Sequence, residues 1–342
     1  MGSKRKAPAE NKKKHDVDRD VQDKSRPAEK SRPAPDVAAD PKEAGGIRMP
    51  SFKLTNTHLF LAGILALALV IRMLPILYSI VNGRVIFAEF DPYYHMRRIV
   101  YSVDHFPFVN SYDSYVNYPY GYIVGWPALF DLIAAAFSLI VGLGSPSRFT
   151  IEIASALVPV LMGLISIVLA FLLVKDIINE KAALFVSLIM AVMWGAVYTQ
   201  LFGYVGHHVL EIIVLLAMYL FFMRGVSAAR SEGMTFSNML SHKKPLAYAV
   251  LAGIVIAASF FSWDGAVVYI AVLIAYAFVQ FIYDAYTRDD SHYLSVVGAV
   301  ASVVAVAGTR LDCRLAGCTL ISANMFTVAC CMRTSGATLP RS

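Results

Sequence analysis

Long apolar stretches alternate with short polar ones from about residue 56 to about residue 307. A bilayer core about 30 Å thick is crossed by about 20 apolar residues in a helix. Runs of suitable character lie near 56–81, 151–174, 182–200, 209–223, 246–263, 266–283 and 294–307. The pattern therefore predicts an all-α polytopic membrane protein, a helical bundle of about seven spans.

The Lys and Arg residues between these runs predict the direction of the chain through the membrane. Basic residues occur in 1–50, in the turn 175–181 and in the linker 224–244, and such residues favour the cytoplasmic side. We therefore predict a multi-pass protein of the cell membrane with a cytoplasmic N-terminus. The loops 82–150 and 201–208 then share the extracellular side, which is the predicted active face.

A further apolar run at 126–142 contains Asp131. The basic segments agree on one side only if this run does not cross, so we predict an external helix lying at the interface. Trp126 at its start suits that position, because an indole has an apolar body and one polar N–H group. The tyrosine-rich loop around it forms an aromatic belt at the headgroups, a substrate surface, or both.

Composition supports a membrane protein and excludes two other classes. Only 16% of the 342 residues are charged and 57% are hydrophobic, whereas soluble domains have about 25% charged residues. Residues 1–50 hold 13 of the 30 Lys and Arg residues, so the pI near 9.0 reflects a basic leader. A water-soluble enzyme and a nucleic-acid-binding domain are both excluded.

The two ends of the chain differ from the transmembrane domain predicted over 51–307. Residues 1–50 contain six prolines and few large apolar side chains, which predicts a disordered basic cytosolic tail. Residues 308–342 hold all four cysteines, without a zinc-type spacing. This second tail is atypical, either frameshifted or divergent, and we assign its cysteines no chemistry.

Two polar segments on the predicted external side carry candidate chemistry. Asp91 follows the first span and precedes Pro92, where a carboxylate either binds a hard cation or caps a helix. His207 and His208 stand at the start of a later span, where imidazoles should face a polar cavity. Neutral His208 can ligate a metal ion while His207 binds an anion such as phosphate. A carboxylate and imidazole site suits Mn²⁺ or Mg²⁺ better than a thiolate metal.

Helical spacing brings one more carboxylate to this pair. Glu211 is four residues after His207 and shares its helical face, whereas His208 lies about 100° away. The alternative for such a histidine pair is a structural role, with both rings hydrogen-bonded to backbone.

Four motifs occur in an order that resembles one known family. They are Phe90-Asp91-Pro92-Tyr93-Tyr94-His95-Met96-Arg97, the stretch from Tyr118-Pro119-Tyr120-Gly121 through Gly125-Trp126-Pro127 to Leu129-Phe130-Asp131, Gly203-Tyr204-Val205-Gly206-His207-His208, and Ser262-Trp263-Asp264-Gly265. Over roughly 55–305 the chain resembles the catalytic subunit of oligosaccharyltransferase in its archaeal form. Members of that family are GT-C glycosyltransferases with thirteen spans and a soluble C-terminal domain.

The resemblance implies an activity and roles for three residues. The family transfers an oligosaccharide from a dolichol phosphate or pyrophosphate carrier to the Asn of Asn-x-Ser/Thr, with Mn²⁺ or Mg²⁺. Asp91 matches the catalytic acid of the first external loop, which also binds the ion. His208 matches a histidine ligand of the ion, and His207 a contact of the lipid phosphate. The implied partners are the lipid-linked oligosaccharide, an acceptor polypeptide and the membrane, with no nucleic acid.

The sequence departs from the family pattern in two places. Gly206 stands where the archaeal motif has an Asp before the two histidines, so we expect weaker metal binding or a substitute ligand. The later external loop with its catalytic Glu, the remaining spans and the WWDYG motif are not in the sequence. We therefore expect the chain to be inactive on its own.

Two other functions stay open at this point. One is a non-catalytic fragment that binds lipid-linked glycan. The other is a small membrane transporter, for which charged groups at mid-membrane depth would line the path. Arg72 is the strongest candidate for such a group within a predicted span.

Overall fold

The computed structural model describes residues 56–315, with side chains as far as 310, and this part is mostly helical. The predicted 1–50 tail and most of 308–342 lie outside the described residues. The elements of the first half are α1 (Asn56–Met73), α2 (Ile76–Ser79), β1 (Ile80–Val81), β2 (Arg84–Val85), α3 (Asp91–Asp104), β3 (Tyr112–Asp113), β4 (Tyr122–Ile123), α4 (Leu129–Val141) and α5 (Arg148–Ile177). Those of the second half are α6 (Glu180–Val192), α7 (Trp194–Tyr198), α8 (His208–Ser231), the 3-10 turn η1 (Met239–Ser241), α9 (Lys243–Phe260), the 3-10 turn η2 (Asp264–Ala266), α10 (Val267–Thr287) and α11 (His292–Leu315).

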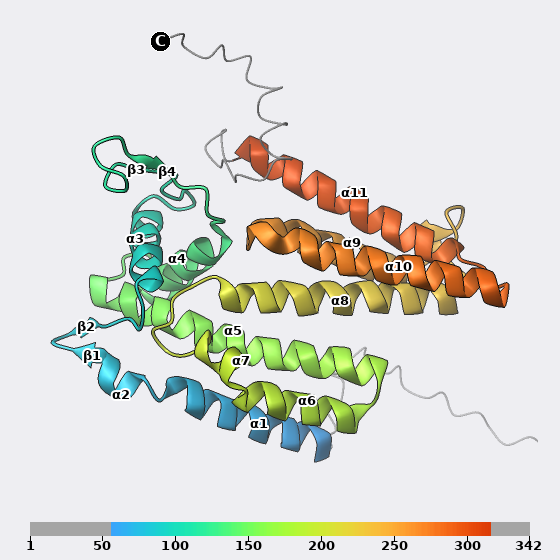
Figure 1. Cartoon of the computed structure of the whole chain (residues 1–342), viewed down its shortest axis with the longest axis horizontal. Helices are drawn as coiled ribbons and strands as arrows, with labels where there is room; N and C mark the ends of the chain where they lie inside the picture. Colours follow the sequence, from blue (N-terminus) through green and yellow to red (C-terminus); the bar gives the residue numbers. More distant parts are fainter. Residues whose placement is uncertain (1–55, 316–342) are drawn as a thin grey trace, which may run out of the picture. The chain divides into compact units, whose positions relative to one another are not determined.

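Long helices run side by side, and α3, α4 and two short hairpins gather at one end of them (Figure 1). In the described part of the chain, six helices are long and apolar enough to cross a membrane. They are Asn56–Ser79, Arg148–Ile177, His208–Ser231, Lys243–Phe260, Asp264–Thr287 and His292–Arg310. The predicted helical membrane bundle is thereby confirmed, while the last helix continues past the end predicted at 307.

The span predicted at 182–200 is divided into α6 and α7, which meet at the extended residue Met193. Its path nevertheless follows that of α1. Glu180 at the start of α6 accepts a hydrogen bond of 3.0 Å from Thr57, near the beginning of α1. Gln200, just after α7, accepts one of 2.9 Å from Arg72 near the end of α1. The segment therefore runs parallel to α1 from one end of the bundle to the other, as the topology predicts.

Arg72 explains how the chain tolerates the break after α6. Its guanidinium is fully buried and donates to the carbonyl oxygens of Met190 and Ala191, at 3.1 and 3.0 Å. Such carbonyls at a helix end have no partner within the helix. Two more bonds, of 2.9 and 2.7 Å, go to Oε1 of Gln200. The donors of Arg72 thus hold α1 against α6 and the residue after α7. Because Arg72 has this structural role, it no longer supports the hypothesis of a transporter with charged groups along its path.

The predicted external segment 82–150 contains β2, α3, the β3–β4 hairpin and α4. α4 has 13 residues, so it is shorter than the helices that can cross. The backbone N–H of Leu129, its first residue, donates to the carbonyl of Phe261, which directly follows α9. At the start of the next helix, α5, Glu152 pairs with Arg84 of β2 at 2.7 Å. α4 therefore begins beside the end of α9. The chain then continues into α5, whose start lies beside β2.

Two apolar cores stabilise this arrangement. The first joins α3, α4, α5 and the start of α8 around side chains such as Phe130 and Val209, which are fully buried. The second joins the later part of α8 to α9, α10 and α11 around Met218 and Val297. Because α8 contributes to both cores, its first turn has a fixed position relative to α3 and α4.

We expect Arg72→Met to destabilise the fold. The substitution keeps an apolar chain of similar length but leaves the carbonyls of Met190 and Ala191 and the Gln200 oxygen without their donor. A buried acceptor without a partner costs about 1–3 kcal/mol. In detergent, the midpoint of thermal unfolding followed by intrinsic fluorescence should fall by roughly 5 °C or more.

The matched control is Arg224→Met, which removes an arginine paired with a partly exposed Asp176 at 2.5 Å. Such exposed pairs contribute about 0–1 kcal/mol, so this variant should unfold close to wild type. Equal midpoints for the two variants would contradict the role given to Arg72.

Candidate functional site

The residues singled out in the sequence come from two elements that meet at one end of the bundle. Asp91 is the first residue of α3 and is exposed. His208 begins α8, and His207 directly precedes it. His207 contacts α3 directly, because its ring lies against that of His95, with ring centroids 5.5 Å apart. The fold therefore brings Asp91 and the histidine pair to the same region.

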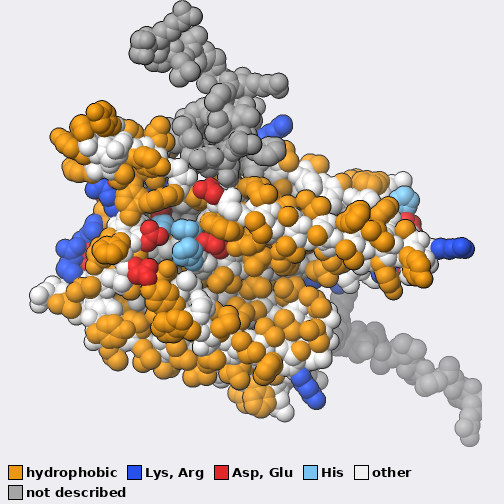
Figure 2. Space-filling model, in the orientation of Figure 1, with side chains coloured by type: hydrophobic (Ala, Val, Ile, Leu, Met, Phe, Trp, Pro, Cys, Tyr) orange, Lys and Arg blue, Asp and Glu red, His pale blue; other side chains and the backbone are white. Residues whose placement is uncertain are grey.

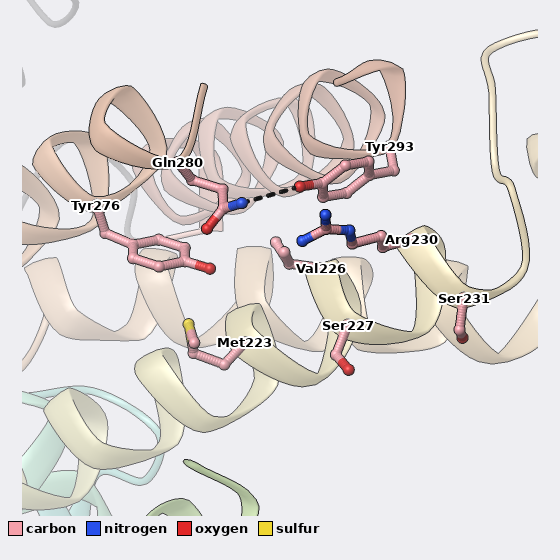
Figure 3. A pocket seen from close by; sticks show the side chains of 8 residues that line it. All are labelled: Met223, Val226, Ser227, Arg230, Ser231, Tyr276, Gln280 and Tyr293. Atoms are coloured by element: carbon pink, nitrogen blue, oxygen red, sulfur yellow. Dashed lines mark hydrogen bonds between the residues drawn. The ribbon is translucent and has the colours of Figure 1, made fainter. Parts of the chain in front are cut away.

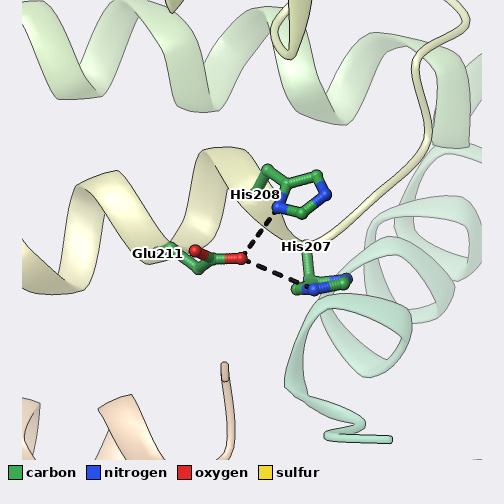
Figure 4. Close-up of side chains that lie close together, drawn as sticks. All are labelled: His207, His208 and Glu211. Atoms are coloured by element: carbon green, nitrogen blue, oxygen red, sulfur yellow. Dashed lines mark hydrogen bonds and ion pairs between the residues drawn. The ribbon is translucent and has the colours of Figure 1, made fainter. Parts of the chain in front are cut away.

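Both histidines point toward Glu211, one turn into α8 (Figure 4). Nδ1 of His208 lies 2.9 Å from Oε1 of Glu211, and Nε2 of His207 lies 3.5 Å from the same oxygen. One ligand atom from each of the three residues lies within 4.8 Å of the others. Two imidazoles and one carboxylate therefore converge on a single small volume.

A buried chain of polar groups lies behind His207. Nδ1 of His207 is 3.4 Å from Nε2 of His95, and Nδ1 of His95 is 2.6 Å from Oδ1 of Asp131 on α4. The second oxygen of Asp131 is 3.1 Å from Nε of Arg98, close enough for charge pairing although not aligned as a hydrogen bond. His95, Asp131 and Arg98 are at most 3% exposed. This series of polar contacts connects α4 to α8 through α3.

Acidic groups border the histidines on their open side. Glu89 and Asp91 line a hollow of about 420 Å³ together with Phe87, Phe90 and Tyr93. Histidine and acidic side chains gather there within a mainly apolar surface (Figure 2). Such a hollow can admit a polar or charged group of a substrate.

The loop before α8 is shaped by its glycines and by burial. Gly203 has a φ of +88°, a conformation that side chains disfavour. Its N–H donates to the carbonyl of Ala156 on α5, and Tyr204 and Val205 are buried. Burial, together with the charges of Glu89, Tyr198 and Asp91, raises the pKa of Tyr204 to about 12. The loop is thus held firmly, and Gly206 contributes no side chain to the site.

Burial decides the protonation of His207. It lowers the pKa of His207 to about 4, aided by the nearby rings of His208 and His95 and opposed by Glu211 and Asp91. Neutral imidazole is the form that binds metal ions. The ring is therefore ready to act as a ligand at neutral pH.

α3 is also tied to the tip of the external segment. Arg97 pairs with Asp113 of β3 through two bonds, of 2.7 and 3.0 Å, and Asp113 is almost fully buried. The hydrogen bond from Arg97, with a further one from the N–H of Tyr115, lowers the pKa of Asp113 despite its burial. The β3–β4 hairpin is therefore fixed to the helix that begins with Asp91.

The donor atoms present suit a divalent ion of the Mn²⁺, Mg²⁺ or Zn²⁺ class. Imidazole nitrogen and carboxylate oxygen bind Zn²⁺ and Mn²⁺, and carboxylates also suit Mg²⁺. The chemistry of His207, His208 and Glu211 therefore fits a divalent metal ion.

Sequence reasoning missed two parts of this site. Asp131 was singled out only for its place in an apolar run, and its bond to His95 joins residues 36 positions apart. Glu89 precedes α3 and carries no motif of its own. Glu211, by contrast, was expected beside His207 from its helical spacing, four residues later in the sequence.

A second hollow, of about 370 Å³, lies toward the other end of α8 (Figure 3). Arg230 enters it but is already paired with Asp289 at 2.8 Å and lies 3.9 Å from Asp284. Gln280 hydrogen-bonds Tyr293 across it. Its charges are balanced internally, so the histidine end is the better candidate site.

Comparison with known proteins agrees with the arrangement. A family model described as oligosaccharyl transferase STT3, N-terminal, matches residues 58–331. Dolichyl-phosphooligosaccharide-protein glycotransferase 2 of Archaeoglobus fulgidus is 32% identical over 204 residues, which cover 59% of this chain and 30% of that protein. The chain thus spans under a third of the length of this relative.

Solved structures show the same fold. The apo crystal structure of the Archaeoglobus fulgidus oligosaccharyltransferase has a TM-score of 0.67 and 20% identity, covering 84% of this chain and 35% of that one. A structure of the archaeal enzyme from that organism with an inhibitory peptide and a dolichol-phosphate has a TM-score of 0.64 and 19% identity, covering 82% and 34%. Another, with Zn and sulfate, has a TM-score of 0.54 and 18% identity, covering 81% and 39%. With the family match over most of its length, this chain belongs to the oligosaccharyltransferase STT3 family and corresponds to its N-terminal part.

Proposed function

We propose that this chain forms the N-terminal part of an enzyme that moves an oligosaccharide from a dolichol phosphate-type carrier to the Asn of Asn-x-Ser/Thr. The observation that carries the proposal is that Asp91, at the start of α3, lies near the His207–His208 pair at the start of α8, beside a hollow lined by acidic groups. Membership of the family and the ligands bound by its archaeal relatives support it.

Each residue has a task that follows from its chemistry. Asp91 and His208 would hold the divalent ion, whose positive charge stabilises a phosphate leaving group. Asp91 is exposed at the mouth of the hollow, so its carboxylate can also accept a hydrogen bond from the acceptor amide. An amide nitrogen is a poor nucleophile because its lone pair is delocalised, and such a bond favours the twisted, more reactive form.

We predict that Asp91→Asn lowers glycan transfer by about 100-fold or more, since a group acting on developing charge contributes that much. The chain is joined to the remaining part of an archaeal relative and incubated with lipid-linked oligosaccharide, Mn²⁺ and a fluorescent peptide containing Asn-Val-Thr. Glycopeptide is measured by its gel shift.

The matched control is Asp104→Asn, at the exposed far end of the same helix. It should retain wild-type transfer. Undiminished transfer by Asp91→Asn would contradict the role of Asp91, and no transfer by the unsubstituted fusion would contradict the proposed function.

The proposed orientation puts the site on the extracellular face and the turn after α8 in the cytoplasm. In a background without the native cysteines, Ser114→Cys should react with a membrane-impermeant maleimide in intact cells, and Ser237→Cys should react only after lysis. Both positions are exposed in the fold. The reverse labelling pattern would overturn the orientation.

A further inference from the structure

The site lacks a side chain at one place where the archaeal pattern predicts a carboxylate ligand. Gly206 cannot bind an ion, and its nearest side-chain neighbour is the ring of Tyr204. An ion held by Asp91 and His208 alone would have few protein ligands. The carboxylate that lies among the histidines is instead that of Glu211, whose side chain is only 12% exposed.

Glu211 is placed as a bridging ligand would be. Its Oε1 is 2.9 Å from a nitrogen of His208 and 3.5 Å from Nε2 of His207. Two ligand atoms that share one ion each lie about 2.0–2.2 Å from it, which puts them about 3–3.5 Å apart. The spacing between His207 and Glu211 therefore matches two ligands of one ion.

The buried contacts behind His207 determine how its ring is oriented. Nδ1 of His207 lies 3.4 Å from Nε2 of His95, whose Nδ1 lies 2.6 Å from Oδ1 of Asp131. Arg98 lies on the far side of Asp131, 3.1 Å from its second oxygen. Nδ1 of His207 therefore faces His95, and its other ring nitrogen, Nε2, faces the Glu211 carboxylate.

A cation between Nε2 of His207 and the Glu211 carboxylate would be bound by both groups, which are two of the ligand types that divalent ions take in proteins. A phosphate in that place would instead lie against the carboxylate of Glu211. The placement of His207 beside Glu211 therefore suits a metal ion better than the lipid phosphate predicted from the sequence. A carboxylate that orients a ligating histidine is a common feature of metal sites, and here a second imidazole lies between the two.

We propose that Glu211 and His207 complete the ligand set of the ion in place of residue 206, with His207 oriented by His95 and Asp131. The inference rests on the proposed metal-dependent function and names the residues through which this chain binds its ion. Asp131 acts as a positioning residue and does not touch the ion.

The first test is binding of Mn²⁺ to the full chain in detergent, measured by loss of the sharp EPR signal of the free ion. Glu211→Gln should weaken binding by more than about 10-fold, because the neutral amide loses the charge that attracts the ion. The control is Glu232→Gln, at the other end of α8, where Glu232 also pairs with a histidine, His242, at 2.9 Å. The control should bind like wild type.

The second test reads the ligands directly by pulsed EPR of the bound Mn²⁺. Wild type should show couplings from two imidazole nitrogens, and His207→Asn should show one. Asp131→Asn should weaken binding about 10- to 100-fold and alter the coupling of His207 alone. An equal thermal unfolding midpoint for Glu211→Gln and wild type shows that the fold is retained.

The outcomes separate this inference from the function on which it rests. Wild-type affinity in Glu211→Gln, or two nitrogen couplings in His207→Asn, overturns the inference. If Asp91→Asn still abolishes transfer in that case, the proposed function stands without it. Absence of Mn²⁺ binding by the wild-type chain contradicts the inference and the metal part of the proposed function together.

Discussion

The hydrogen bond between His95 and Asp131 holds the site together, because it connects α3 to α4 in a region that excludes water. Through the contact of His95 with His207, the same series of polar contacts extends to α8. A polar group buried in an apolar environment costs free energy unless it is paired, so these groups constrain one another. The position of Asp91, at the start of α3, follows from this constraint. The Arg72 network does the same for α1 and α6, where the membrane offers no water to a broken helix.

Apolar periodicity predicted most of the helical architecture, because a span of about 20 residues leaves a strong signal. The positions of the basic segments predicted that the short helix at Leu129–Val141 does not cross the membrane, since only that choice placed all of them on one side. Apolar periodicity did not predict the break at Met193. Residues 182–200 are mostly apolar, with no local signal of a break. The break is stabilised by Arg72, which is remote in sequence.

The site was predictable to the extent that its residues stand in motifs. Asp91 and the pair His207–His208 lie where the motifs put them, although their roles remain proposals. Asp131 was not predictable as a partner of His95, because nothing local in an apolar helix reveals a tertiary hydrogen bond. Glu211 differs, since helical spacing alone places it beside His207. Gly206 provides no carboxylate, so the spacing of His207 and Glu211 is the basis for the metal-ligand set that we propose for this chain.

The measurement that tests this account most directly is an anomalous difference map from crystals of the chain grown with Mn²⁺. The account predicts one peak at the start of α8, about 2.0–2.3 Å from a nitrogen of His207, a nitrogen of His208 and an oxygen of Glu211. A peak bound by Asp91 and His208 alone, with Glu211 turned away and His207 on an anion, would contradict it.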